Sequence, residues 1–217
     1  QGLSAGVLLL VLAGSATDAI MILAFNVLTA AQTGNTILFA VAIARGDFAT
    51  GLSSSVSIVC FIAGALGGGW VCRRTRPQNA LFLQVALLSS ALVLWLTIKD
   101  HQPGASMGNV LVGLAAASMG LQSAITIHLH GQSGTYITGL LTNFAVNLGA
   151  PRQPSSPPAS SMGLVWLLYL AGATLSGFIF VAVGPLALLI PITALLTSSV
   201  LTARSRAFST FPGSPKA

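Results

Sequence analysis

Residues 30–39, AAQTGNTILF, place a run of polar and small residues inside a long apolar part of the chain. The flanking residues have the composition of helices buried in lipid, where each unpaired backbone group is costly. Residues 3–44 number only 42, barely two spans of about 20 residues each, and no polar turn separates them. We therefore predict that residues 26–44 form an extended stretch followed by a half-helix that begins near Thr33.

The composition indicates the class of protein. Of the 217 residues, 54% are hydrophobic and only 6% are charged, with a mean hydropathy of +0.87. A soluble domain carries roughly a quarter charged residues, so we predict an all-α polytopic membrane protein. The net charge of +6 comes from short connections, which excludes a nucleic-acid partner. The sequence predicts neither a metal site nor a cofactor. The expected partners are the lipid bilayer and a small solute, and a homo-oligomer stays open.

Eight apolar segments are expected, and they form a single transmembrane domain over residues 1–203. Their approximate ranges are 3–25, 26–44, 52–71, 80–98, 110–129, 134–148, 163–183 and 186–203. Residues 204–217 are polar and contain two prolines, so we predict a disordered C-terminal tail.

A repeat underlies these segments. Thr33-Gly34 recurs 105 residues later as Thr138-Gly139, and other short matches keep the same offset. We therefore predict two structurally repeated halves, near residues 1–100 and 105–203, with a second half-helix starting near Thr138.

The number of full spans stays open between eight and six plus two broken segments. If segments two and six dip into the membrane and return, seven of the nine basic residues share one side. The positive-inside rule favours that arrangement, and both arrangements place the C-terminus in the cytoplasm. The membrane would be a bacterial inner membrane or a eukaryotic plasma membrane.

The two polar interruptions are candidates for a solute site near the membrane midplane. The unpaired N–H groups at the start of a half-helix favour an anion or the negative end of a polar solute. Thr33 and Thr138 are expected as N-caps, while Gly34 and Gly139 serve either ligand approach or helix packing. The candidate solute-binding residues are Gln32, Thr33, Gly34, Asn35, Thr36, Gln122, Ser123, Tyr136, Thr138 and Gly139.

Asp18 is the only acid inside an apolar segment. A carboxylate at membrane depth is costly and marks a functional site by default. Asp18 could carry a coupling proton, bind a cation, or form a hydrogen bond with Gln122 or Ser123 of the other half. The structural alternative is a hydrogen bond that holds the two halves together.

Several of these motifs resemble a known family. The markers are Asp18-Ala19, Thr33-Gly34-Asn35, Gly120-Leu121-Gln122 and the run from Thr135 to Gly139. In them the chain resembles the YoaK-like family, an uncharacterised family of multi-spanning membrane proteins with a domain of unknown function. The resemblance covers nearly the whole chain. It implies the membrane fold and no particular substrate.

The function expected from the sequence is a secondary transporter or permease for a small polar or anionic solute. Its site would lie between the halves, with proton coupling through Asp18. The alternatives are a scaffold that transports nothing and a membrane enzyme. No catalytic residue is nominated, because three acids and three histidines provide little chemistry at membrane depth.

Overall fold

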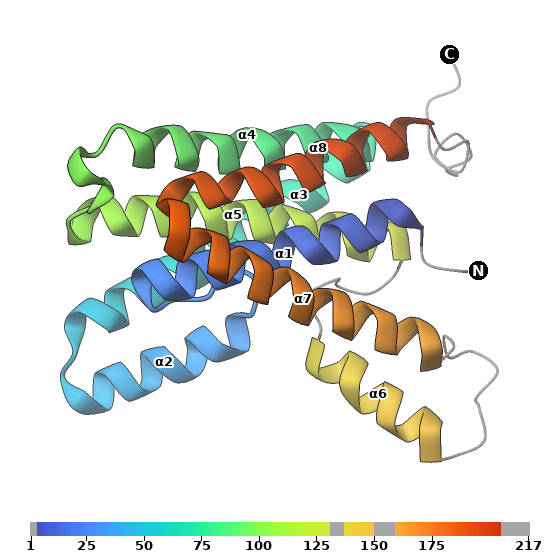
Figure 1. Ribbon diagram of the computed structural model, residues 1–217, viewed down its shortest axis with the longest axis horizontal. Coiled ribbons are helices and arrows are strands. Elements are labelled where there is room, and N and C mark those ends of the chain that lie inside the picture. The colour runs from blue at the N-terminus through green and yellow to red at the C-terminus, as the bar shows by residue number, and fades with distance from the viewer. Residues whose placement is uncertain (1–3, 131–136, 150–158, 205–217) are drawn as a thin grey trace.

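The computed structural model describes residues 4–130, 137–149 and 159–204, and helices dominate it (Figure 1). Two 3-10 helices, η1 (Lys99–His101) and η2 (Gly184–Leu188), lie between α4 and α5 and between α7 and α8. The predicted all-α architecture is confirmed. The α-helices are α1 (Ala5–Phe25), α2 (Gln32–Arg45), α3 (Phe48–Arg74), α4 (Pro77–Leu96), α5 (Ala105–His130), α6 (Ile137–Gly149), α7 (Ala159–Val183) and α8 (Leu189–Arg204).

Five runs within the described residues are long and apolar enough to cross a membrane. Four of them correspond to α1, α3, α4 and α5. The fifth, Ser161–Thr202, is 42 residues long and contains most of α7, all of η2 and most of α8. The chain turns back at η2, and α7 and α8 diverge from that turn, both packing on α1 (Figure 1). The protein is therefore an integral membrane protein with several spans.

Helix α2 is too short to cross a bilayer. It has 14 residues, which correspond to a length of about 21 Å. Of α6, 13 residues are described. The hydrocarbon core of a bilayer is about 30 Å thick. Helix α2 begins at Gln32 after the non-helical residues 26–31, as predicted from the polar run. Helix α6 is described from Ile137, one residue before the predicted start.

The short helices point in opposite directions. Both α2 and α6 begin near the middle of the bundle and run toward opposite ends of it (Figure 1). Residues 26–31 therefore lead the chain from the last residue of α1 back toward the middle of the bundle. Helix α2 then runs to the end of the bundle at which α1 ends (Figure 1).

Two close pairs of long helices build the bundle. Helix α3 packs on α5 and α1 packs on α7, while α4 lies against α5 and α8, and α8 also contacts α1. The short helices lie outside, α2 on α3 and α6 on α7. At one end of the core, Trp95 is buried between Phe25 and Phe180, with ring centroids 5.0 Å and 5.8 Å away.

Glycines set the approach of α3 to α5. A Cβ atom at Gly64 would collide with the backbone carbonyl of Ala117, and one at Gly120 would collide with the carbonyl of Phe61. A Cβ at Gly68 would press on Leu121 and Ala124. Only small residues permit such backbone contact between membrane helices.

We predict that Gly64→Ala lowers the free energy of unfolding in detergent by about 1–3 kcal/mol or more, because backbone atoms cannot move aside as a side chain does. Gly67→Ala is the matched control in the same helix, since a Cβ there has open space around it. Titration with SDS, followed by circular dichroism, measures both variants. Equal stability of the two variants would contradict the close α3–α5 contact.

Candidate functional site

The non-helical segment 26–31 is held by a carboxylate from α1. Asn26 adopts a left-handed conformation with φ of 56° and ends α1, and the chain then returns along that helix. The Asp18 side chain is 4% exposed and lies beside the returning segment. One Asp18 oxygen, Oδ1, accepts hydrogen bonds from the N–H groups of Thr29 at 2.6 Å and Ala30 at 2.7 Å. Oδ2 accepts from the Ala31 N–H at 3.1 Å.

These contacts satisfy the backbone where the helix is broken. Three consecutive amide N–H groups, which can only donate, face an oxygen pair that can accept several hydrogen bonds. The Thr29 hydroxyl adds a fourth contact to Oδ1 at 3.1 Å. Ala31 occupies the N-cap position of α2 and provides no side-chain cap. Asp18 therefore holds the non-helical residues that lead into α2.

The opposite side of segment 26–31 is bound by amide and hydroxyl side chains. Asn35 of α2 is fully buried, accepts from the Leu28 N–H at 3.0 Å and donates to the Leu28 carbonyl. Ser57 of α3 donates to the same carbonyl at 2.7 Å and accepts from Asn35 at 2.9 Å. Gln32 donates to the Thr29 carbonyl at 2.8 Å and to Ser57 at 3.3 Å. Polar groups from three helices thus fix the segment.

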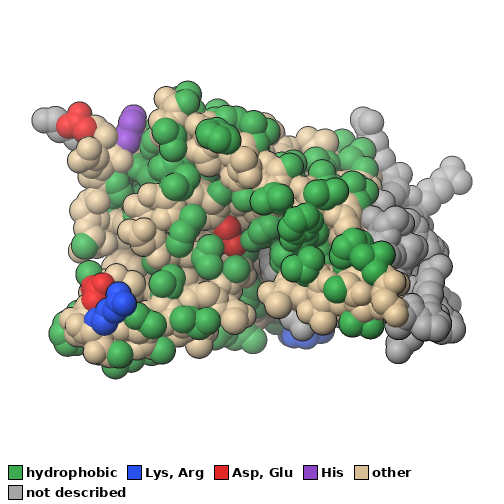
Figure 2. All heavy atoms as spheres, turned by 60° about the horizontal axis from the view of Figure 1, so that its bottom comes forward, with side chains coloured by type: hydrophobic (Ala, Val, Ile, Leu, Met, Phe, Trp, Pro, Cys, Tyr) green, Lys and Arg blue, Asp and Glu red, His purple; other side chains and the backbone are tan. Residues whose placement is uncertain are grey.

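One hydrogen bond joins this cluster to α7. The Tyr169 hydroxyl donates to Asp18 Oδ2 at 3.2 Å, across 151 positions of sequence. The two helices come close because Gly172, one turn after Tyr169, faces Ser15, one turn before Asp18. A Cβ at Gly172 would collide with the Ser15 hydroxyl. In Figure 2 an acidic side chain appears in the middle of a face that is largely hydrophobic, away from the charges at the left end.

The predicted residues of α2 divide into two groups. Gln32 and Asn35 face the cluster, whereas Thr33 and Thr36 are exposed on the outer side of the helix. The prediction that Thr33 caps α2 is wrong: the helix starts before it, at Gln32, and its N-cap residue is Ala31, with no side-chain cap. Gly34 lies against the Leu28 side chain of the non-helical segment, whose end a Cβ would overlap.

The corresponding residues of the second half are only partly described. Thr138 is exposed and its carbonyl accepts from Thr142 at 2.9 Å, within the first turns of α6. Gly139 is half-buried. Tyr136 and the predicted C-terminal tail, residues 205–217, lie outside the described residues. The structure therefore brings together the candidates of the first half without joining Thr138 or Gly139 to them.

Gln122 lies in a second buried polar group rather than on Asp18. Its amide donates to the Leu10 carbonyl of α1 at 2.8 Å, and its oxygen accepts from Gln84 of α4 at 2.7 Å. The expected hydrogen bond between Asp18 and Gln122 is therefore wrong. The adjacent Ser123 is buried, at 4% exposure.

Sequence reasoning missed four residues of these groups: Thr29, Ser57, Gln84 and Tyr169. Gln84 and Tyr169 carried a usable signal, since each places a polar group deep in an apolar run. Neither Thr29 nor Ser57 stands out, because hydroxyl side chains are frequent throughout the apolar segments.

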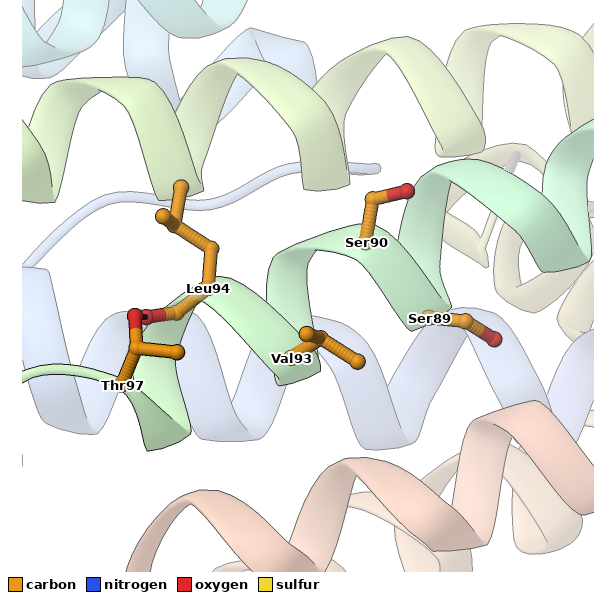
Figure 3. A pocket seen from close by; sticks show the side chains of 5 residues that line it. All are labelled: Ser89, Ser90, Val93, Leu94 and Thr97. Atoms are coloured by element: carbon orange, nitrogen blue, oxygen red, sulfur yellow. Dashed lines mark hydrogen bonds between the residues drawn. The ribbon is translucent and has the colours of Figure 1, made fainter.

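A shallow hollow lies elsewhere, on α4 alone. Ser89, Ser90, Val93, Leu94 and Thr97 line it, and Figure 3 shows all five side chains on successive turns of that helix. Ser90 donates to the Ala86 carbonyl and Thr97 to the Leu94 carbonyl, so both hydroxyls bond within their own helix. The hollow shares no residue with the Asp18 cluster and presents no convergent polar groups.

We predict that Asp18→Asn lowers the free energy of unfolding by about 1–3 kcal/mol, because the amide replaces one accepting oxygen with an NH₂ group and leaves buried donors without an acceptor. Tyr169→Phe should cost less. In the double variant the two losses should be coupled by about 0.5 kcal/mol or more, since the side chains share a hydrogen bond.

SDS unfolding of the single and double variants measures this coupling. Asp100→Asn is the control, because Asp100 is exposed with φ of 55°, a conformation that Asn adopts readily. Strict additivity of Asp18→Asn and Tyr169→Phe would argue against the contact between α1 and α7.

Comparison with known proteins identifies the family of the chain. Residues 6–201 match a family described as protein of unknown function (DUF1275). The chain is also similar to UPF0700 transmembrane protein RA0705 of Rhizobium meliloti (strain 1021), with 29% identity over 183 residues, which cover 83% of this chain and 77% of the relative. No solved structure matches. The family resemblance noted in the sequence is thereby confirmed: the chain belongs to the DUF1275 family of transmembrane proteins.

Proposed function

We propose that the protein is a secondary transporter for a small polar or anionic solute, with Asp18 as the proton-coupling group. The observation that carries the proposal is the set of hydrogen bonds from Asp18 to the amides of residues 29–31 and to Tyr169. A broken helix at membrane depth, held by an ionisable side chain, is a recurring element of transport sites.

Two repeated halves of inverted orientation are part of the proposal. Thr33-Gly34 lies at the start of α2, and Thr138-Gly139, 105 residues later, lies in the described part of α6. In such a repeat, α1, α2, α3 and α4 correspond to α5, α6, α7 and α8. The contacts then occur in matching pairs: α3–α5 corresponds to α7–α1, α4–α5 to α8–α1, and α2–α3 to α6–α7. The opposite directions of α2 and α6 support inversion rather than a parallel repeat (Figure 1).

Protonation of Asp18 provides a mechanism for coupling. A protonated carboxyl carries one O–H donor, so one of its oxygens can no longer accept from every amide that it binds in the present arrangement. The attachment of residues 29–31 to α1 then weakens, together with the contact to Tyr169 in the other half. Movement of the halves, and of the solute site at Gln32–Asn35, would follow from loss of these contacts.

The orientation we propose places both termini in the cytoplasm. Arg73, Arg74 and Arg76 lie at the end of the bundle where α3 meets α4, and Arg204 ends α8 at the same end (Figure 1). The opposite end carries Arg45 and Lys99, each within two residues of an aspartate. The positive-inside rule assigns the first end to the cytoplasm.

The test uses protein reconstituted in liposomes on a solid-supported membrane. Rapid addition of inorganic phosphate, sulfate, oxalate or glycine at several pH values probes four impermeant polar solutes. We expect a transient current with at least one of them, dependent on pH, which Asp18→Asn reduces at least tenfold and Asp100→Asn leaves unchanged.

Two outcomes would overturn parts of the proposal. A pH-dependent current that survives in Asp18→Asn would remove the proton role of that residue. Folded protein that gives no current with any solute at any pH would favour the scaffold, in which the paired polar groups of the cluster serve stability alone.

A further inference from the structure

The cytoplasmic end of α3, as proposed above, combines exposed positive charge with an exposed apolar surface. Arg73, Arg74 and Arg76 are all exposed, within four residues of one another. The α4–α8 contact brings the end of α8, at Arg204, to the same end of the molecule. The acids outside the apolar segments, Asp47 and Asp100, lie in connections at the other end (Figure 1).

A continuous row of large side chains leads along α3 to these arginines. Val59, Ile62, Leu66 and Trp70 are 64%, 52%, 70% and 52% exposed. Their spacing of three or four residues places them on one face of the helix, and Arg73 and Arg74 continue the row by a further turn. The same face is therefore apolar over about three turns and cationic at its end.

Trp70 links the apolar and cationic parts. The Arg74 guanidinium lies over the Trp70 ring, 4.8 Å from its centroid. Tryptophan is enriched at the level of lipid headgroups, where its ring is apolar and its N–H is hydrated. Next to this pair, Gly67 is exposed and has open space where a Cβ would stand. The surface beside Leu66 and Trp70 is thus bare of side chains.

We propose that this end of α3 binds one anionic phospholipid, with its phosphate at Arg73 and Arg74 and an acyl chain along the row from Trp70 to Val59. Guanidinium groups suit phosphate oxygens, and the charge at this end has no nearby acid to neutralise it. A soluble phosphate would use the arginines alone, whereas the exposed apolar row next to them matches an amphiphile. Along α3 the cationic residues are followed by the apolar row, just as the phosphate of a phospholipid is followed by its acyl chains.

The opposite end provides a contrast. Arg45 lies two residues from Asp47, and hydrogen bonds from Thr50, with a smaller contribution from Arg45, hold the pKa of the Asp47 carboxyl below its usual range. The basic group there is matched by an ionised acid, so we expect no preference for anionic lipid at that end.

Fluorescence quenching by brominated lipids tests the proposal on the full-length protein in liposomes. Brominated phosphatidylglycerol should quench Trp70 more strongly than brominated phosphatidylcholine at equal mole fraction. The contribution of Trp70 is obtained by difference from Trp70→Phe. Removing two cationic side chains, with Arg73→Gln and Arg74→Gln together, should reduce the preference for phosphatidylglycerol roughly tenfold.

Three controls make the result decisive. The double variant Arg73→Lys, Arg74→Lys should keep most of the preference for phosphatidylglycerol. This result would show that the Gln variants lose the preference because they lose charge and not because they fail to fold. Arg45→Gln should leave it unchanged. Glycerol phosphate added at millimolar concentration should compete weakly, since it lacks acyl chains. Equal quenching by the two lipids, an equal loss in Arg45→Gln, or full displacement by glycerol phosphate would each overturn the assignment.

Discussion

The hydrogen bonds from Asp18 to the amides of residues 29–31 are the interaction on which the rest of the structure depends. Inside a bilayer no water is available to satisfy a broken helix, so its N–H groups must find partners within the protein. An ionised carboxylate offers two oxygens that only accept hydrogen bonds, whereas a hydroxyl or amide side chain offers one accepting oxygen and also has donors to place. The carboxylate is thereby surrounded by the donors of the segment that leads into α2.

Small residues determine whether Asp18 can act in this way. Gly172 lets α7 approach α1 closely enough for the Tyr169 hydroxyl to reach the carboxylate. The equivalent contact between α3 and α5 at Gly64 and Gly120 fixes α3, which carries Ser57 to the other side of the same segment. Helix packing and hydrogen bonding are therefore coupled. The close α1–α7 and α3–α5 contacts position Tyr169 and Ser57, and the hydrogen bonds of the cluster hold residues 26–31 in place.

The sequence predicted the break in the second segment because its cause is local. A polar run together with too few residues for two spans indicates a half-helix, and α2 starts at Gln32, one residue from the predicted position. The partner of Asp18 could not be predicted in the same way, because Tyr169 lies 151 positions away on a helix whose rotation the sequence does not specify. The offset of 105 indicated Ser123 and its neighbour Gln122, but Gln122 faces Gln84 and Leu10 instead. The contact of Gly34 with Leu28 could not be predicted either, because it depends on how the non-helical segment folds back on α2.

Hydrogen–deuterium exchange of the amides of residues 26–31 tests the central claim most directly, with the protein in a lipid nanodisc. The account predicts that these amides exchange slowly in the natural protein, as slowly as those of the neighbouring helices. In Asp18→Asn they should exchange at least tenfold faster, with little change in α4. Fast exchange in the natural protein, or equal rates in the two proteins, would contradict a segment whose backbone is held by this carboxylate.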